Sequence, residues 1–325
     1  MSEDMTIGTH APTLSKAPEI SIVIPVYNEE KNLPLLFERL TAVVDKLGRP
    51  TEVVLTDDGS KDNSLALMKS FVEKRPDIMR VVEFDRNYGQ HMAVMAGFET
   101  ARGEIIVTLD ADLQNPPEEI PKLLAEVDAG HDVVGSYRRN RQDSVFRTLP
   151  SRIINLIRER ITGIKMRDQG CMLRAYRRNI VRMIVESGET STFIPALAQF
   201  YAERPSEVEV EHAARHAGAS NYNLYKLIRL NFDLMTGFSL VPLQVFTMVG
   251  MAVSAASLLL VVYMLLRRLF LGPEAEGIFT LFAILFFLLG VVITGLGIVG
   301  EYVGRIYQQI RSRARFRIRA IHEKN

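Results

Sequence analysis

Tryptophan is absent from the 325-residue sequence, and cysteine occurs once, as Cys171. A single cysteine permits no intrachain disulfide, which agrees with a reducing compartment. The motif G-x-G-x-x-G is also missing from the first loop, which reads VYNEE, and this argues against a dinucleotide-dependent dehydrogenase. The net charge is only +1 and no interleaved basic and aromatic surface is visible, so the chain is not expected to bind nucleic acid.

Charged residues are absent from two long segments, Phe238 to Leu266 and Gly277 to Gly300. Each is longer than the roughly 20 residues that a helix needs to cross a bilayer. Two such segments in succession predict a transmembrane hairpin over 238–304, with spans at about 238–266 and 277–300. Small residues in the second span, such as Gly290 and Gly295, would suit contact between protomers of a homo-oligomer, and equally helix bending or lipid contact.

Lysine and arginine are distributed unevenly around these segments. The turn between the spans holds Arg267 and Arg268 together with two glutamates, whereas arginines concentrate after the second span. Because basic flanks resist translocation, both termini are expected in the cytoplasm. Residues 305–325 are expected to form a basic tail attracted to anionic lipid headgroups. Residues 1–18 are polar and lack the apolar core of a signal peptide, which predicts a flexible N-terminal tail.

Apolar strands and amphipathic helices are predicted to alternate between residues 19 and 220. The strands are expected over 19–25, 52–56, 79–84, 104–109 and 132–136, and the helices over 32–46, 63–74 and 90–100. This alternation is typical of an α/β domain with a mostly parallel, doubly wound sheet. The next segment, 221–237, mixes apolar and charged residues directly before the first span, which favours an amphipathic helix in the membrane interface.

Two aspartates, Asp110 and Asp112, directly follow the predicted strand over 104–109. Paired carboxylates are hard oxygen ligands and suit Mg²⁺ or Mn²⁺ that carries a substrate diphosphate. An ordinary helix start is the alternative, because Pro116 and Pro117 precede two glutamates as in a first helical turn. The position favours a metal site, since open α/β sheets bind ligands beyond the carboxyl ends of their strands.

Several motifs occur in the order typical of one enzyme family. IPVYNEE, TDDGSKDNS, LDADLQNPPEEIP and the closing pair of spans resemble the polyprenyl-phosphate glycosyltransferases, which are inverting enzymes with the GT-A fold. The motifs RNYGQHMAVMAGF, NRQDSVFR, DQGCMLRAYRRNIV, STFIP and GEYVGRIY are more narrowly similar to the undecaprenyl-phosphate 4-deoxy-4-formamido-L-arabinose transferases of the lipid A aminoarabinose pathway. The resemblance runs from about Ile20 to Arg313.

This resemblance implies a GT-A domain over 19–220 that transfers a sugar from a UDP donor to undecaprenyl phosphate. The protein would be a multi-pass component of the bacterial inner membrane with its catalytic domain in the cytoplasm. By resemblance, the nucleotide is held by Pro25, Tyr27, Asn28, Glu29, Asp57, Asp58 and Asp110. An ordinary turn with a helix cap is the alternative for Asp57 and Asp58. Binding is favoured for Asp57, and both interpretations stay open for Asp58.

The resemblance also implies a metal site and an acceptor site. The metal ligands would be Asp110, Asp112 and Gln114, and the acceptor phosphate would be held by Arg138, Arg141, Arg147 and Ser151. A solvated basic loop is the alternative for these arginines; binding is favoured for Arg138 and Arg147, and both interpretations stay open for Arg139 and Arg141. Catalytic roles fall on Asp112, Arg138, Arg147 and Asp168, the last as a base or as an orienting group. A phosphate monoester is already largely anionic near neutral pH, so it needs placement by arginine more than it needs a base.

Arg215, Gly218 and Ser220 resemble a mobile loop that in relatives reads R-x-x-G-x-S-K, with Asn221 here in place of the lysine. That replacement removes a cation from the loop.

Glucosyl or mannosyl transfer to a polyprenyl phosphate is an alternative function, because these residues do not identify the sugar. A processive polysaccharide synthase is disfavoured, since its usual Gln-x-x-Arg-Trp motif needs tryptophan. A non-catalytic membrane scaffold is the most distant alternative.

Overall fold

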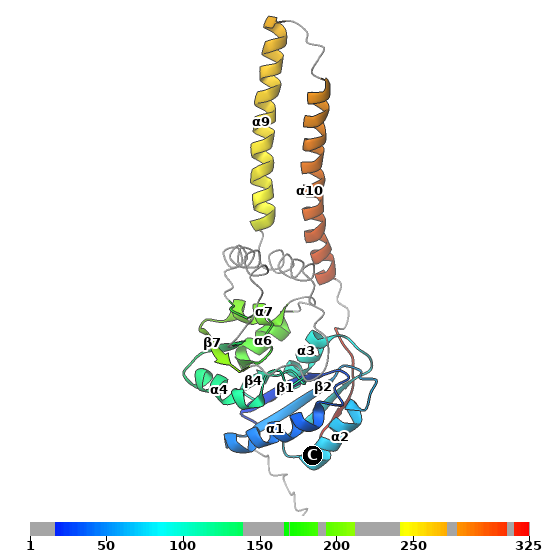
Figure 1. Cartoon of the computed structure of the whole chain (residues 1–325), viewed down its shortest axis with the longest axis vertical. Helices are drawn as coiled ribbons and strands as arrows, with labels where there is room; N and C mark the ends of the chain where they lie inside the picture. Colours follow the sequence, from blue (N-terminus) through cyan, green and yellow to red (C-terminus); the bar gives the residue numbers. More distant parts are fainter. Residues whose placement is uncertain are drawn as a thin grey trace, which may run out of the picture.

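The computed structural model describes residues 17–138, 166–168, 170–187, 193–211, 241–271, 278–310 and 315–324. These residues form an α/β head and two long helices, α9 (Val241–Leu271) and α10 (Ile278–Ile310), which extend from one side of the head (Figure 1). The predicted interfacial helix over 221–237 lies outside the described residues.

The described part of the head is built on an eight-stranded sheet with the order β7-β5-β6-β4-β1-β2-β3-β8. Its strands are β1 (Ile20–Val26), β2 (Thr51–Asp57), β3 (Met79–Phe84), β4 (Ile105–Thr108), β5 (Val133–Arg138), β6 (Arg174–Arg177), β7 (Pro205–Val210) and β8 (Ile318–His322). The central strands β4, β1, β2 and β3 are parallel. Strand β6 is antiparallel to β4 and β5, and β8 is antiparallel to β3. The mostly parallel sheet predicted from the sequence is therefore confirmed.

Helices cover both faces of the sheet and explain why its central strands are continuously apolar. The helices of the head are α1 (Leu33–Leu47), α2 (Ser64–Lys74), α3 (Gln90–Thr100), α4 (Ile120–Asp128), α6 (Arg178–Glu186) and α7 (Ile194–Tyr201), with a short 3₁₀ turn at Pro117–Glu119. Alternate residues of β1 enter different cores, since Ile22 and Ile24 pack with α1 and α2 whereas Val23 packs with α3. The predicted helices and strands agree with these elements to within a few residues.

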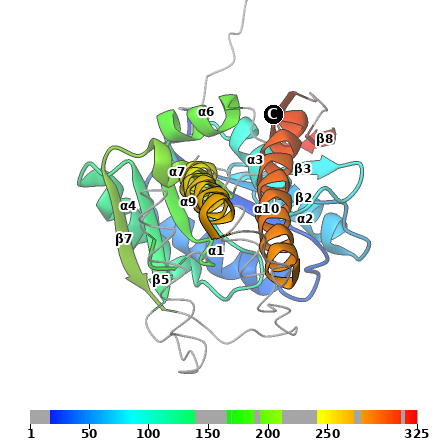
Figure 2. The ribbon, with the colours of Figure 1, turned by 90° about the horizontal axis from the view of Figure 1, so that it is seen from above.

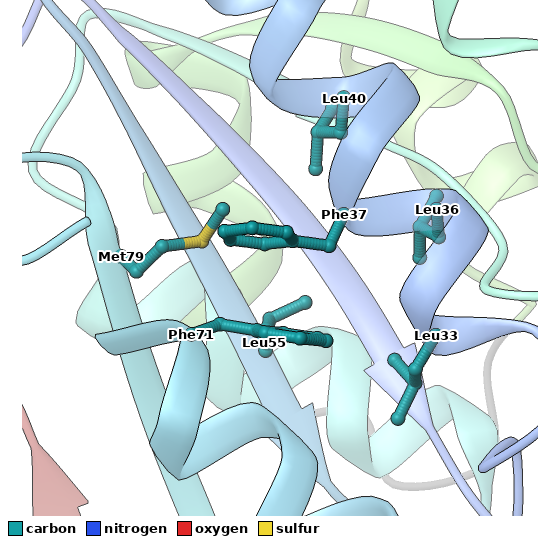
Figure 3. Close-up of a pocket in the computed structure, with 7 residues that line it drawn as sticks. All are labelled: Leu33, Leu36, Phe37, Leu40, Leu55, Phe71 and Met79. Carbon is teal, nitrogen blue, oxygen red and sulfur yellow. The ribbon is translucent and has the colours of Figure 1, made fainter. Parts of the chain in front are cut away.

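A small pocket between α1, α2 and the sheet is lined by seven apolar side chains (Figure 3). Phe37 of α1 stacks on Phe71 of α2 with ring centroids 4.2 Å apart and an interplanar angle of 15°. Leu36 and Leu40 contribute to the same core from the buried face of α1. Such a lining stabilises the head and offers no polar side chain to a ligand.

The end of the chain is where the sequence prediction is wrong. Residues 305–325 were expected to form a basic tail, but α10 continues to Ile310 and Ile318–His322 forms strand β8 at the edge of the sheet. Phe316 stacks on Phe84 of β3, with centroids 5.2 Å apart. The many arginines hide a two-residue alternation in FRIRA, in which Phe316, Ile318 and Ala320 are less exposed than the intervening arginines.

Ion pairs reinforce this edge strand. The Nε2 atom of His322 lies 2.8 Å from Oε2 of the buried Glu83, and Lys69 lies 3.0 Å from the same carboxylate. Glu323 pairs with Arg80 at 2.7 Å and with Arg102 at 3.0 Å. Burial opposes ionisation of Glu83, but the hydrogen bonds from His322 and Lys69 outweigh it and lower its pKa.

The helices α9 and α10 lie side by side in both views (Figures 1 and 2). Within the described residues, α10 contains one segment long and apolar enough to cross a membrane, Phe287–Gly304, whereas the apolar segment found in α9, Leu243–Val253, is shorter. The two predicted spans are thus supported in part. A Cβ on Gly295 would lie 2.3 Å from the Phe246 ring, so this glycine permits close packing of α10 against α9.

Leu36 and Leu35 offer a matched test of the core. Leu36→Ala should lower the free energy of unfolding by about 2–5 kcal/mol, because its side chain is 1% exposed and leaves a cavity. Leu35→Ala, on the same helix but 42% exposed, should change it by less than about 1 kcal/mol. Urea denaturation of the full chain, followed by circular dichroism, measures both values. Equal effects would contradict this packing.

The Glu83 carboxylate should hold β8 on the sheet. A carboxyl with a lowered pKa stabilises the fold above its ordinary pKa, and that contribution is lost as the pH falls through the lowered value. At pH 7, Glu83→Gln should reduce hydrogen-exchange protection of residues 318–322 by about tenfold, equivalent to about 1.4 kcal/mol. Glu73→Gln, the same change on the exposed side of α2, is the control. Unchanged protection in Glu83→Gln would show that β8 docks without this carboxylate.

Candidate functional site

The candidate site is assembled by the loops that follow four neighbouring parallel strands. The first loop (27–32) follows β1, the second (58–63) follows β2, the third (85–89) follows β3 and the fourth (109–116) follows β4. Because these strands are parallel and adjacent, the four loops meet at one edge of the sheet. The strand order reverses between β1 and β4, which is where open α/β sheets form their ligand crevice.

Hydrogen bonds connect the first loop to the second. The Asn28 N–H donates to Oγ of Ser60 at 3.1 Å, and Asn28 Oδ1 accepts from the Lys61 N–H at 2.8 Å. The Glu29 N–H donates to Oγ of Ser64 at 2.8 Å. Asn28 has a φ of +56°, a left-handed conformation that is uncommon outside glycine and often marks functional loops. Two predicted nucleotide residues, Asn28 and Glu29, are therefore bonded to the second loop and the start of α2, and Pro25 precedes them as the sixth residue of β1.

Tyr27 and Asp57 lie at this edge in different environments. The Tyr27 ring is partly exposed and can present a flat face to a base. The Asp57 side chain is 1% exposed at the end of β2, and both its oxygens accept from the Ser60 N–H at 3.3 Å. Burial raises the pKa of Asp57 despite those hydrogen bonds, because the interior disfavours its charge. A carboxylate that is buried despite this desolvation cost is typical of a binding site.

Asp58 closes the third loop. Its oxygens accept from the N–H groups of Tyr88 at 2.6 Å and Gly89 at 2.9 Å, and the side chain is 2% exposed. Burial raises its pKa, and the two backbone donors oppose that rise. The loops also approach closely, since a Cβ on Gly59 would lie 2.5 Å from the Arg86 carbonyl carbon. The structure thus gives Asp58 a role in loop geometry, and its contact with nucleotide stays a prediction.

The fourth loop presents the predicted metal ligands at alternate positions. Asp110, Asp112 and Gln114 are partly exposed, whereas the residues between them are buried. Leu113 has a φ of +60°, and the Gln114 N–H donates to Asp112 Oδ1 at 3.1 Å. Among the described residues, no three His, Cys, Asp or Glu side chains form a metal cluster. Two carboxylates and an amide nevertheless fit Mg²⁺ or Mn²⁺, which commonly complete their shell with water and substrate phosphate.

The predicted acceptor residues Arg138 and Asp168 form a bidentate ion pair. Arg138 Nε lies 2.5 Å from Asp168 Oδ2, and Nη2 lies 3.1 Å from Oδ1. Asp168 also accepts from the Gly170 N–H at 3.0 Å and is 3% exposed. Because Thr108 at the end of β4 pairs with Arg174 at the start of β6, this segment reaches the same edge as the metal loop. Because both Asp168 oxygens are engaged by the Arg138 guanidinium, the geometry favours an orienting role.

Two sets of side-chain contacts at this edge were not predicted from the sequence. The Gln90 amide donates to Asp110 Oδ1 at 2.7 Å, from the first turn of α3. Below the surface, the Cys171 thiol donates to Asn115 Oδ1 at 3.3 Å and lies 2.8 Å from Ser136 Oγ. Burial raises the pKa of Cys171, which keeps it a thiol. These tertiary contacts leave no local pattern in the sequence.

Other predicted site residues cannot be located in the described part of the chain. Arg141, Arg147, Ser151, Arg215 and Ser220 lie outside the described residues. Their predicted roles therefore stay predictions.

Comparisons with known proteins agree with this arrangement. Residues 21–185 match the family described as Glycosyl transferase family 2, and residues 241–306 match the GtrB C-terminal hairpin. A protein of Serratia proteamaculans named undecaprenyl-phosphate 4-deoxy-4-formamido-L-arabinose transferase is 49% identical over 93% of this chain and 94% of its own length. The protein of the same name from Yersinia enterocolitica is 48% identical over 94% of both chains. A crystal structure of a mycobacterial protein covers 67% of this chain and 73% of that one, with 19% identity and a TM-score of 0.50.

The raised pKa of Asp57 predicts the direction in which its replacement changes the free energy of unfolding. Protonation of such a carboxyl favours folding below its ordinary pKa, and this contribution is lost as the pH rises through the raised value. At pH 7, Asp57→Asn should therefore raise the free energy of unfolding, because it removes a buried charge. Asp62→Asn should lower it, because hydrogen bonds outweigh burial and lower the Asp62 pKa. Urea denaturation at pH 7 and pH 4 measures both, and a destabilised Asp57→Asn would contradict the burial argument.

Proposed function

The chain belongs to glycosyl transferase family 2 and, within it, to the undecaprenyl-phosphate 4-deoxy-4-formamido-L-arabinose transferases, and we propose that it transfers 4-deoxy-4-formamido-L-arabinose from a UDP donor to undecaprenyl phosphate. The family match and the sheet agree with the predicted GT-A catalytic domain. The observation that carries the proposal is the meeting of Asp57, Asp110 and Arg138 at one edge of the sheet, in a chain that matches these transferases over nearly its whole length.

The donor half of the site follows from the first, second and fourth loops. Asp57 would accept hydrogen bonds from the nucleoside while the exposed Tyr27 ring stacks on the base. Asp110, Asp112 and Gln114 would hold Mg²⁺ or Mn²⁺ on the diphosphate. When bound, that ion neutralises the negative charge that develops on the departing UDP. The partial exposure of these three side chains leaves them accessible to the substrate.

The acceptor half requires placement of a phosphate, not removal of a proton. One acceptor oxygen forms a bond to the anomeric carbon as the bond to UDP breaks, with inversion at that carbon. This oxygen is already anionic, since the second pKa of a phosphate monoester is near 6. Arg138 would attract it, and Asp168 would fix the orientation of the Arg138 guanidinium through the bidentate pair.

The hairpin would keep the head close to its lipid substrate. Only residues 311–317 separate the end of α10 from β8, and a segment of that length spans at most about 25 Å. The head would therefore stay beside the membrane on the side where α10 ends. With basic residues flanking the hairpin, that side would be the cytoplasm of a bacterial cell, with α9 and α10 both crossing the inner membrane.

Purified full-length protein should convert undecaprenyl phosphate to its 4-deoxy-4-formamido-L-arabinosyl form, detected by mass spectrometry. The reaction should need Mn²⁺ or Mg²⁺ and stop with EDTA. Asp112→Asn should lower kcat at least about 100-fold, because an electrostatic group at the departing diphosphate is lost. Asp128→Asn, which removes an exposed partner of Arg49, should leave kcat unchanged.

The donor screen should include UDP-glucose and GDP-mannose as competitors. A glycolipid formed only from a hexose donor would overturn the sugar assignment, and no glycolipid from any donor would overturn the enzyme assignment. Full turnover by Asp112→Asn would overturn the metal site.

A further inference from the structure

Gln90 occupies a position that the proposed reaction does not yet explain. It is the first residue of α3, its side chain is exposed, and its Nε2 atom donates to Asp110 Oδ1 at 2.7 Å. Asp110 is one of the two carboxylates of the fourth loop. The contact therefore joins the start of α3 to the loop that would face the diphosphate.

The start of α3 is itself fixed from another strand. Asp58, at the end of β2, accepts from the backbone N–H groups of Tyr88 and Gly89, the two residues before Gln90. Gly89 has a φ of +96°, which a side chain at this position would strain. Buried Asp58 thus fixes the backbone of Tyr88 and Gly89, which lead into α3. This turn places Gln90 at the start of α3, where its side chain contacts Asp110.

The chemistry of glutamine suits this contact. An amide N–H can orient a carboxylate without neutralising it, so Asp110 keeps its charge for a cation. A lysine at the same position would bring a permanent positive charge to Asp110 and would compete with a divalent ion. Carboxylates that bind metals are commonly held by such outer hydrogen bonds, whose loss weakens metal binding.

We propose that Gln90 is a positioning residue that holds Asp110 ready for the divalent cation of a nucleoside diphosphate, and that Asp58 acts on the same site through the third loop. This inference rests on the proposed function, since it presumes that Asp110 serves a metal and diphosphate. It adds a residue from α3 and a path from β2 to the site. Gln90 would act through Asp110 and not on the reacting atoms.

Binding of Mn²⁺ in the presence of UDP tests this directly, with free Mn²⁺ measured by electron paramagnetic resonance on the full chain. Gln90→Ala should weaken Mn²⁺ binding about tenfold or more, and Gln90→Lys should weaken it further. Affinity for UDP without metal should stay within about twofold, which shows that the fold and the nucleoside site persist. Gln199→Ala on α7 is the matched control and should bind Mn²⁺ as the unchanged protein does.

A double-mutant cycle tests the connection to Asp58. If Asp58 acts through Gln90, the losses in Mn²⁺ affinity from Asp58→Asn and Gln90→Ala should not add, whereas additive losses would contradict the path. Unchanged Mn²⁺ affinity in both Gln90→Ala and Gln90→Lys would overturn the inference and leave the proposed function intact. An unsubstituted protein that binds no Mn²⁺ with UDP would overturn both.

Discussion

The direction of the central strands is the constraint on which the site depends. Because β4, β1, β2 and β3 run parallel, their loops all open at one edge, and the antiparallel β6 brings Asp168 back to that edge. Buried carboxylates then hold these loops together, at an electrostatic cost visible in the raised pKa values of Asp57 and Asp58. A sheet covered by helices on both faces can bear that cost, because its large apolar core supplies the stability.

Much of the head could be predicted from the sequence because its signals are local. Continuous apolar strands, helical spacing and the Asp110–Asp112 pair each occupy one short segment. The β8 strand escaped prediction because its arginines suggested a solvated tail, and its pairing with β3 is a contact across more than 200 residues. The Gln90 and Cys171 contacts were missed for the same reason, since nothing near either residue records its partner in the fold.

The return of the chain from α10 to β8 joins the C-terminal helical hairpin to the sheet of the head. Strand β8 pairs with β3, and β3 leads directly into the loop that positions Gln90. The helical hairpin and the candidate donor site are therefore connected through two paired strands, β8 and β3. This arrangement suits an enzyme whose acceptor is a lipid, because a hairpin inserted in the membrane would keep the head close to the bilayer.

The proposed reaction depends on Asp110 and Asp112, which would hold a divalent cation against the diphosphate of UDP. Electron–nuclear double resonance of the full chain with Mn²⁺ and UDP tests it most directly, through the coupling of Mn²⁺ to phosphorus. We expect a strong phosphorus coupling that disappears when both aspartates are replaced by asparagine. A coupling that survives this double replacement, or none in the unsubstituted protein, would contradict it.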